Sequence, residues 1–463
     1  MESESIASGR RRRIGPGTIV LIGAGGLLLL VLLFTARFKI TGRRALNAEL
    51  AKIRAAGEPA SAGELESYYQ SPPSDRDTTQ LWLQATEPLG TPQFQSDAKA
   101  LPIVGMGLET VPWPGEPWPE LAEAEQLLAQ YQRSLELMHQ AAREGGLARY
   151  PTRFADGGMT LLPHVQQLRT GVRLLALEAA VEGHHGRPDA AVDAIVTIFA
   201  AGRSLEQEPC IVSQLVRIAI DGTARERVRW LSSALALDDA QLARLDAELA
   251  ACEYRRSTYI ALLGERVIGI EAFANPAKLG DEGEAFAFLG AFNGDRDQIM
   301  YLQLMGELIA AADKSREAGE LAAAKVDVQL QQLAGSRGSR LSHPLTLMLM
   351  PALSAFMEAA SRNEASRDAT RAAVAVERFR LANDRLPQTL DELTPTFLDA
   401  VPIDPFDGAR LRYRIDAMEY VVYSVGKDKV DQNGQSEPPS QGDDVAARVR
   451  IQKAPAEPSA PQQ

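Results

Sequence analysis

An uncharged run near the start of the chain constrains the fold more than any other feature. No charged residue occurs from Ile14 to Ala36, and the stretch from Ile19 to Phe34 is almost wholly apolar. A helix of this length, rising roughly 1.5 Å per residue, is about long enough to cross ~30 Å of hydrocarbon. We therefore predict a transmembrane helix over residues 14–36, in contact with membrane lipid, after a basic tail over residues 1–13. A cleaved signal peptide and a buried core helix are the alternatives, and no small-x-small cleavage pattern follows the run.

Composition predicts a mainly α chain. Its 463 residues suffice for two or three domains, and 45% of them are hydrophobic. Aromatic residues make up only 6%, whereas Ala and Leu are abundant, which favours helices over a large β-sandwich. The net charge of −12 is uneven, because residues 1–44 carry eight basic and two acidic residues, a balance of +6 that leaves −18 for the rest. Such an acidic body argues against nucleic acid as a partner.

The juxtamembrane region, residues 37–119, combines short helices with a proline-rich loop. Apolar spacing predicts three helices: Ala45–Ala56, Ser61–Tyr69 and Thr78–Thr86. The prolines of residues 88–119 exclude a continuous helix there. Trp113 and Trp118 stand among those prolines and form a candidate partner-binding site. Burial against the body is the alternative, because tryptophans in a long loop more often pin the loop in place.

Residues 120–340 have the pattern of an α-helical array. Helices are expected over Leu121–Arg143, Leu161–Val181, Pro188–Leu205, Pro209–Leu231, Leu237–Glu253, Arg255–Phe273 and Asp297–Leu333. A glycine-rich break is expected at residues 280–294. The short connectors predict antiparallel neighbours. The helical hairpins resemble tetratricopeptide-like arrays, although the strict 34-residue period of that family is absent.

The segment from residue 366 to residue 434 predicts a small α+β unit. Ala369, Ala372, Val376 and Phe379 mark one face of a helix that Asn383-Asp384 should end. A short helix over Thr389–Leu398 should follow. Two runs with a period of two then predict an antiparallel hairpin: Leu411/Tyr413/Ile415 and Val421/Tyr423/Val425. Residues 445–451 alternate as a further strand, and residues 453–463 are Ala-, Pro- and Gln-rich, which predicts a disordered tail.

The order of these pieces resembles the globular head of the type II secretion major pseudopilins (G-type). The resemblance rests on the helix end at residues 380–387, on Leu393-Thr394-Pro395, on residues 401–406, on Tyr413 and on residues 420–426, after which Gly426-Lys427-Asp428 begins an acidic loop. It implies a linker helix and a pilin-like head over residues 341–452, with secretion or cell-envelope proteins as partners. It also implies a calcium site in the acidic loop.

The rest of the pseudopilin pattern is missing. No Phe follows Gly15 or Gly17, and the apolar run contains no Glu. The head is separated from the span by about 300 residues, so it cannot pack into a filament as a pilin does. Charge counting around the span gives a tie, because four basic residues precede it and four follow it. The short tail and the resemblance favour a single-pass protein of the bacterial cytoplasmic membrane, with the N-terminus inside and the body extracytoplasmic.

Candidate calcium ligands are Asp428, Asp431, Asp443 and Asp444. Their carboxylates offer the hard oxygen atoms that Ca²⁺ prefers. A solvated loop is the alternative, because the spacing is not that of an EF-hand and Lys427 and Lys429 interrupt the acidic residues.

Catalytic motifs are not recognisable in the sequence. No Gly-x-Ser-x-Gly elbow, Walker loop, His-Glu-x-x-His or Cys-x-x-Cys occurs. His184-His185 falls in a predicted helix turn, where adjacent histidines point in different directions. Two cysteines, Cys210 and Cys252, are too few for a disulfide framework. We therefore expect a membrane-anchored, non-enzymatic protein with a helical partner-binding body. An extracytoplasmic ligand- or peptide-binding module, and an enzyme with its site in a groove of the array, are the alternatives.

Overall fold

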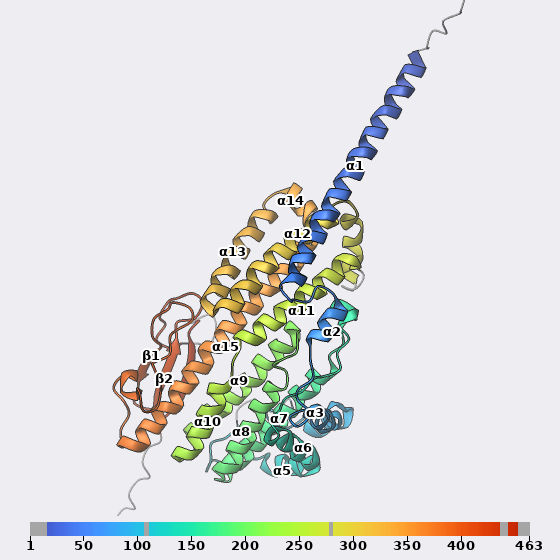
Figure 1. Cartoon of the computed structure of the whole chain (residues 1–463). Helices are drawn as coiled ribbons and strands as arrows, with labels where there is room; N and C mark the ends of the chain where they lie inside the picture. Colours follow the sequence, from blue (N-terminus) through green and yellow to red (C-terminus); the bar gives the residue numbers. More distant parts are fainter. Residues whose placement is uncertain (1–15, 106–110, 277–280, 436–442, 452–463) are drawn as a thin grey trace, which may run out of the picture.

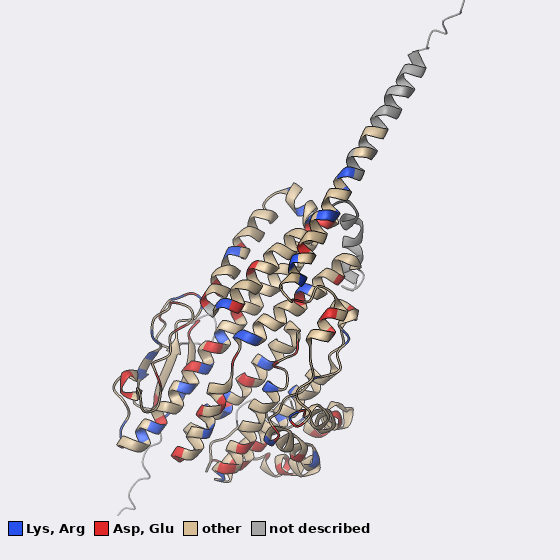
Figure 2. Ribbon diagram, in the orientation of Figure 1, with Lys and Arg blue, Asp and Glu red and all other residues tan. Residues whose placement is uncertain are grey.

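A computed structural model describes residues 16–105, 111–276, 281–435 and 443–451. This part of the chain is mainly helical, as composition predicted, and carries a three-stranded antiparallel sheet near its C-terminal end (Figure 1). The predicted basic tail (1–13) and disordered tail (453–463) lie outside the described residues. Acidic and basic residues interleave along the helices of the body (Figure 2).

The elements follow one another along the chain in a simple order. The helices are α1 (Pro16–Ala55), α2 (Ala62–Tyr68), α3 (Thr79–Thr86), α4 (Pro92–Ala98), α5 (Leu121–Gln130), α6 (Gln132–Arg143), α7 (Pro163–His184), α8 (Pro188–Arg203), α9 (Ile211–Ala234), α10 (Asp239–Ala251), α11 (Arg255–Ala274), α12 (Asp281–Lys314), α13 (Arg316–Ala334), α14 (Arg337–Ser342) and α15 (Pro344–Asn383). Short 3-10 helices are η1 (Glu87–Gly90), η2 (Phe154–Met159) and η4 (Leu390–Leu393). The strands are β1 (Arg412–Ile415), β2 (Glu419–Ser424) and β3 (Val445–Arg450).

α1 is a single helix of 40 residues that contains most of the predicted span and continues into the body. Its first part projects away from the other elements, and its last part packs against α12 (Figure 1). Leu29 and Leu33 are exposed on the projecting part, whereas Leu46 is only 1% exposed. The helix is followed by Gly57 with a φ of +75°, a conformation that glycine adopts without steric cost. Membrane crossing by residues 14–36 stays a prediction, because most side chains of that segment lie outside the described residues.

α15 is the helix, within the described part of the chain, whose length and composition would suit a membrane crossing. Half of its most apolar window is buried inside the fold, as in a core helix. Its first half contributes Met350 and Phe356 to a core shared with α12 and α13, and its last half packs against the sheet. The predicted linker helix and the predicted head helix are therefore one element. It ends at the predicted place, where Asp384 takes a left-handed conformation with φ 53°.

Buried apolar side chains form three larger clusters along the body. The first joins α3, α6, α7, α8, α9 and α10, and the second joins the inner end of α1 to α11, α12, α13 and α15. The third lies between α15 and the sheet. Consecutive helices such as α7 and α8, and α8 and α9, pack against each other, as their short connectors predicted. α11 and α12 also pack against each other, although a glycine-rich break was expected between them. Packing also crosses the predicted domain boundary at residue 340. α15, which follows this boundary, belongs both to the third cluster and to the second, whose other helices precede the boundary.

Two predictions in the first half of the chain were wrong in detail. The helix expected over Leu121–Arg143 breaks at Tyr131, whose ring packs edge-on against Phe94 at 4.9 Å and whose hydroxyl donates to Asp97 at 3.1 Å. These contacts hold Tyr131 against α4, a helix that the sequence analysis treated as loop. α4 forms because Pro92 suits a first helical position and Thr91 caps it, accepting from the Phe94 N–H at 3.3 Å.

Three later predictions were also wrong. The helix expected over Asp297–Leu333 is interrupted at Ser315, whose hydroxyl accepts from the Ala318 N–H at 3.2 Å and caps α13. Residues 281–294 are not a break but the beginning of α12, since an isolated glycine costs a helix only about 1 kcal/mol. The short helix expected over Thr389–Leu398 shrinks to the 3-10 helix η4. Pro395 explains this, because the residue before a proline is driven to extended backbone, and Thr394 has φ −98° and ψ 144°.

Candidate functional site

The predicted hairpin is present, and a third strand extends it. β1 and β2 pair antiparallel with Tyr413 opposite Val422, and β2 and β3 pair with Tyr420 opposite Val449. The strand order is β1-β2-β3, so β2 is central. We call the sheet, the end of α15 beside it and the connecting loops the head (residues 366–451). It is the part of the chain on which the pseudopilin resemblance rests.

One face of the sheet packs against α15. Tyr420 and Val422 share a core with Val376 of the helix. Tyr420 is fully buried, and its hydroxyl lies 3.0 Å from the Ala373 carbonyl oxygen and 2.9 Å from Glu377 Oε1. Burial, and then the Glu377 carboxylate, hold the pKa of Tyr420 well above its usual value. The phenol therefore stays neutral and donates to the helix, which fixes the sheet against α15.

The other face of the sheet is covered by the loop after β2. Val421 and Tyr423 are buried there, under residues 426–435. Gly434 makes the approach feasible, because it has a φ of +79° and a Cβ at this position would lie 3.0 Å from Val421 Cγ1 and 3.2 Å from Tyr423 Cδ1. Both faces of β2 are therefore buried. Tyr420 and Val422 face α15 while Val421 and Tyr423 face the loop, so the period of two predicted for this run does not mark a solvent-exposed face.

Asp404 ties the preceding loop to the end of β2. Its carboxylate is fully buried and accepts from the N–H groups of Phe406 (3.0 Å) and Val425 (2.9 Å) and from the Ser424 hydroxyl (2.8 Å). Arg412 Nη1 donates to the same carboxylate at 2.6 Å. The sequence analysis named Asp404 only within residues 401–406 of the pseudopilin resemblance and gave its side chain no role. A buried anion with four donors is instead a central part of the head's structure.

Asp443, one of the four predicted calcium ligands, holds the acidic loop to α15. Its Oδ1 accepts from Arg362 Nη1 at 2.6 Å, and its Oδ2 accepts from the Lys427 N–H at 2.7 Å. Burial acts to raise the pKa of Asp443, but the hydrogen bond and the charge of Arg362 outweigh it and the pKa is lowered. Both carboxylate oxygens are thus engaged within the protein.

Asp444 has a different environment. It is fully buried, and its Oδ2 accepts from the N–H groups of Gly434 (2.6 Å) and Gln432 (3.2 Å). Its Oδ1 is buried without a hydrogen-bond partner in the described part of the chain. Burial raises the pKa of Asp444, and the nearby charges of Asp431 and Asp428 raise it further. A bound cation would relieve this cost.

The acidic loop supplies part of a calcium donor set. Asp431 accepts from the Tyr423 hydroxyl and the Asn433 N–H, and Asp428 accepts within the loop. Over the ranges that the structure describes, no three His, Cys, Asp or Glu side chains converge on one point. The Oδ1 atom of Asp444 fits a hard cation, whereas Asp443 is committed to Arg362. Calcium binding therefore stays a prediction, and Asp444 is the one of the four predicted ligands that best fits this role.

The two tryptophans of the candidate partner site lie at different depths. Trp118 is 6% exposed and belongs to the first core, with the His184 ring edge-on at 5.5 Å. Trp113 is partly exposed and stacks on Trp230 at 6.1 Å, with the Arg450 guanidinium 4.4 Å above it. The loop is thus held to α9 and β3 through Trp113. A partner would reach only this second indole without rearrangement.

A histidine in the helical array lines an open cavity of about 450 Å³. His139 Nδ1 lies 2.7 Å from Thr197 Oγ1, and its Nε2 lies 2.9 Å from Glu178 Oε2. The sequence analysis recorded no role for His139, because its partners come from α7 and α8, far away in the chain. His185, which follows α7, pairs with Glu125 on α5.

The two cysteines form no bridge. Cys210 and Cys252 are both free and buried, and burial raises the pKa of each thiol to about 12. Protonated, buried thiols behave as small apolar side chains.

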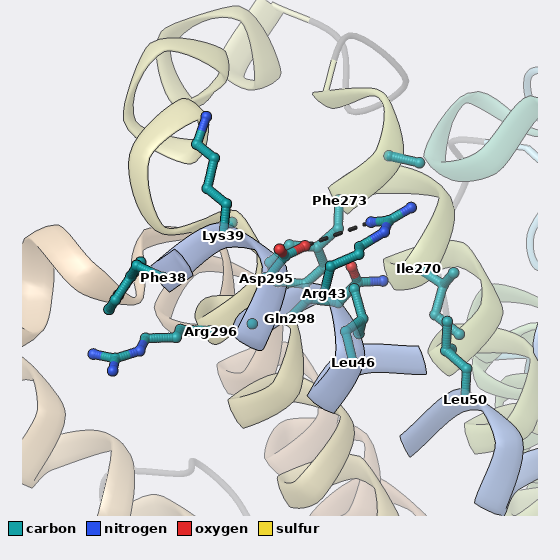
Figure 3. Close-up of a pocket in the computed structure, with 13 residues that line it drawn as sticks. Phe38, Lys39, Arg43, Leu46, Leu50, Ile270, Phe273, Asp295, Arg296 and Gln298 are labelled. Atoms are coloured by element: carbon teal, nitrogen blue, oxygen red, sulfur yellow. Dashed lines mark hydrogen bonds and ion pairs between the residues drawn. The ribbon is translucent and has the colours of Figure 1, made fainter. Parts of the chain in front are cut away.

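A second cavity lies where α1 enters the body. This α1 cavity has a volume of about 510 Å³ and is lined from α1 by residues such as Phe38, Lys39 and Arg43, and from α12 by Asp295 and Arg296. Arg43 Nη1 lies 3.4 Å from Asp295 Oδ1, the contact drawn as a dashed line in Figure 3. The sequence analysis missed this cavity, although the cluster of basic residues after the apolar run was a visible signal for it.

Comparison with known proteins adds no relative. No protein-family model, curated protein or solved structure matches the chain. The pseudopilin resemblance therefore rests on the residues of the head alone.

Proposed function

We propose that this protein is a membrane-anchored, non-enzymatic protein that presents a pilin-like head to a partner in the bacterial cell envelope, such as a secretion assembly. Residues 14–36 form the anchor and the helical body forms the spacer. In this proposal the body and the head are extracytoplasmic.

The observation that carries the proposal is the continuity of α15. One 40-residue helix contributes to the core beside α12 and α13 and then packs the sheet of the head. The last part of α1 packs in the same core. The head lies at the end of the body opposite the projecting part of α1 (Figure 1). A head joined in this way is held at a fixed distance from the anchor, which suits a protein that positions a binding surface.

The head also offers apolar side chains to a partner. Met418, in the turn between β1 and β2, is 58% exposed, and Ile415 beside it is 40% exposed. Val430 in the acidic loop is 55% exposed. Exposed apolar groups of this size are common at protein interfaces when they cluster. Met418 is therefore the most informative position for trapping a partner.

Photo-crosslinking in cells tests this proposal. A photoreactive residue is placed at Met418, and a matched control at Leu321 on α13, which is 74% exposed but lies outside the head. We expect crosslinks between Met418 and a defined envelope protein, and a much weaker signal from Leu321. Equal crosslinking from both positions, or partners that are all cytoplasmic, would contradict the proposal.

An enzyme is the second candidate, and the cavity at His139 is the observation that favours it. Asp193 and Arg244 also line this cavity, so acidic, basic and imidazole groups meet at one open site. Substitution of His139 by Ala separates the two candidates. If cells with His139→Ala lose the function that the wild type supports while crosslinking at Met418 is unchanged, the enzyme is favoured. If these cells keep that function, the anchored binding protein is favoured.

A further inference from the structure

The α1 cavity lies at the level where a lipid headgroup would be found. Lys39 is three residues and Arg43 seven residues beyond Ala36, the end of the predicted span, which places them about 5 Å and 10 Å further along the helix axis. The headgroup layer on each side of a bilayer is roughly 5–8 Å thick, so the Lys39 backbone lies within it and the Arg43 backbone lies just beyond it, from where the long Arg43 side chain can reach back to a lipid phosphate. Phe38 precedes Lys39, and aromatic residues often mark this layer.

The charge of the cavity suits an anion. Its lining contains three basic residues, Lys39, Arg43 and Arg296, against one acidic residue, Asp295. Lys39 and Arg43 are four residues apart and therefore share one face of α1. Arg43 is 67% exposed and its contact with Asp295 is long, at 3.4 Å, so that its guanidinium has donors to spare. Basic residues of α1 lie where the helix meets the body (Figure 2).

Side chains of α12 form the opposite wall of the cavity. The Arg296 guanidinium lies 4.4 Å from the centre of the Phe38 ring, which holds this charge beside the cavity. Figure 3 shows Phe38 and Arg296 together on one side, Arg43 next to Asp295 with the contact between them dashed, and the Lys39 side chain extending away from both pairs. No carboxylate among the described residues is within ion-pair distance of Lys39 or Arg296. Among the described residues, the cavity therefore has basic side chains from two helices against one carboxylate, that of Asp295.

We propose that the α1 cavity binds the phosphate of an anionic phospholipid from the membrane that anchors the protein, with Lys39 and Arg43 as its direct contacts. This inference rests on the proposed anchor. The bound lipid would hold the beginning of the body, where α1 meets α12, at the membrane surface.

Native mass spectrometry of the full-length protein in a neutral detergent tests the inference. Phosphatidylglycerol, phosphatidylcholine and inorganic phosphate are titrated separately. The test variant is Lys39→Ala with Arg43→Ala. The control is Lys52→Ala with Arg54→Ala, which removes the same two residue types from the same helix, about 20 Å further along its axis, and likewise breaks one inter-element ion pair, that of Arg54 with Glu64.

A juxtamembrane basic residue changes anionic lipid affinity about five-fold. We therefore expect the test variant to bind phosphatidylglycerol at least ten-fold more weakly than the wild type, and the control variant to bind it within about two-fold. Phosphatidylcholine should bind weakly to all three proteins, and inorganic phosphate should not displace phosphatidylglycerol. Equal lipid binding by the two variants, or displacement of the lipid by inorganic phosphate, would overturn the inference.

Fractionation of the same cells separates this result from the anchor itself. If the wild type is in the membrane and the two variants bind lipid equally, the α1 cavity is not a lipid site and the anchor stands. If the wild type is recovered in the soluble fraction, the anchor fails and the inference fails with it. Identical thermal melting of the two variants would show that a loss of lipid binding is not a loss of folding.

Discussion

Replacing Asp404 by Ala tests whether the head is held together as the structure indicates. The substitution leaves three buried donors without their acceptor: the N–H groups of Phe406 and Val425 and the Ser424 hydroxyl. Arg412 loses one partner but keeps Asp407, so its contribution is small. The buried carboxylate has no replacement among its neighbours.

The expected cost follows from those three donors. A buried donor left without a partner costs about 1–3 kcal/mol, and some of this cost is recovered when water enters the site. We therefore expect the head to be destabilised by about 3–5 kcal/mol, the range found when one partner of a buried charge pair is removed. At roughly 1.4 kcal/mol per factor of ten, local opening should become about 10²- to 4 × 10³-fold more frequent.

Hydrogen exchange of the full-length protein measures this change directly. Amides of β2 should exchange about 10²- to 4 × 10³-fold faster in Asp404→Ala, whereas exchange of the amides of α7 and α8 should be unchanged. The control is Asp399→Ala, the same substitution at an exposed position of the same head, which should leave exchange within about two-fold. Equal exchange of β2 in the two variants would refute the role given to Asp404.

Three further predictions concern pH, burial and calcium. Burial raises the pKa of Glu265 to about 7 from 4.5, so its stabilising contribution is complete below pH 4.5 and is lost as the pH rises through 7. In urea unfolding, the free energy of unfolding of Glu265→Gln relative to that of the wild type should therefore rise by up to about 3 kcal/mol between pH 4.5 and 8. A difference that does not change with pH would contradict this. Trp118→Ala should cost about 3–5 kcal/mol and Trp113→Ala about 1 kcal/mol in the same assay, and equal costs would count against the assigned burial. Millimolar calcium should raise the melting temperature of the wild type but not of Asp444→Asn, and no response from either protein would remove the calcium prediction.

Local patterns predicted most of the secondary structure. The face of α15 from Ala369 to Phe379, its end at Asp384 and the pairing of Tyr413 with β2 all follow from spacing and turn chemistry near each residue. These features are local, so the sequence around each position carries the signal.

What the sequence could not reveal depends on contacts between distant residues. The break at Tyr131 comes from Phe94 and Asp97 on α4, and the covered second face of β2 depends on Gly434. The four donors around Asp404 come from separate parts of the head, and the α1 cavity needs α1 and α12 side by side. The periodicity of a single segment contains no information about these contacts with distant segments.

The proposed function and the proposed lipid site both depend on the membrane anchor, and carbonate extraction of membranes tests this anchor most directly. Membranes from cells making the full-length protein are washed at high pH, which releases peripheral proteins, and a protein comprising residues 37–463 is treated in parallel. We predict that the full-length protein stays in the membrane pellet and that the shortened protein is released. Release of the full-length protein into the supernatant would contradict the account.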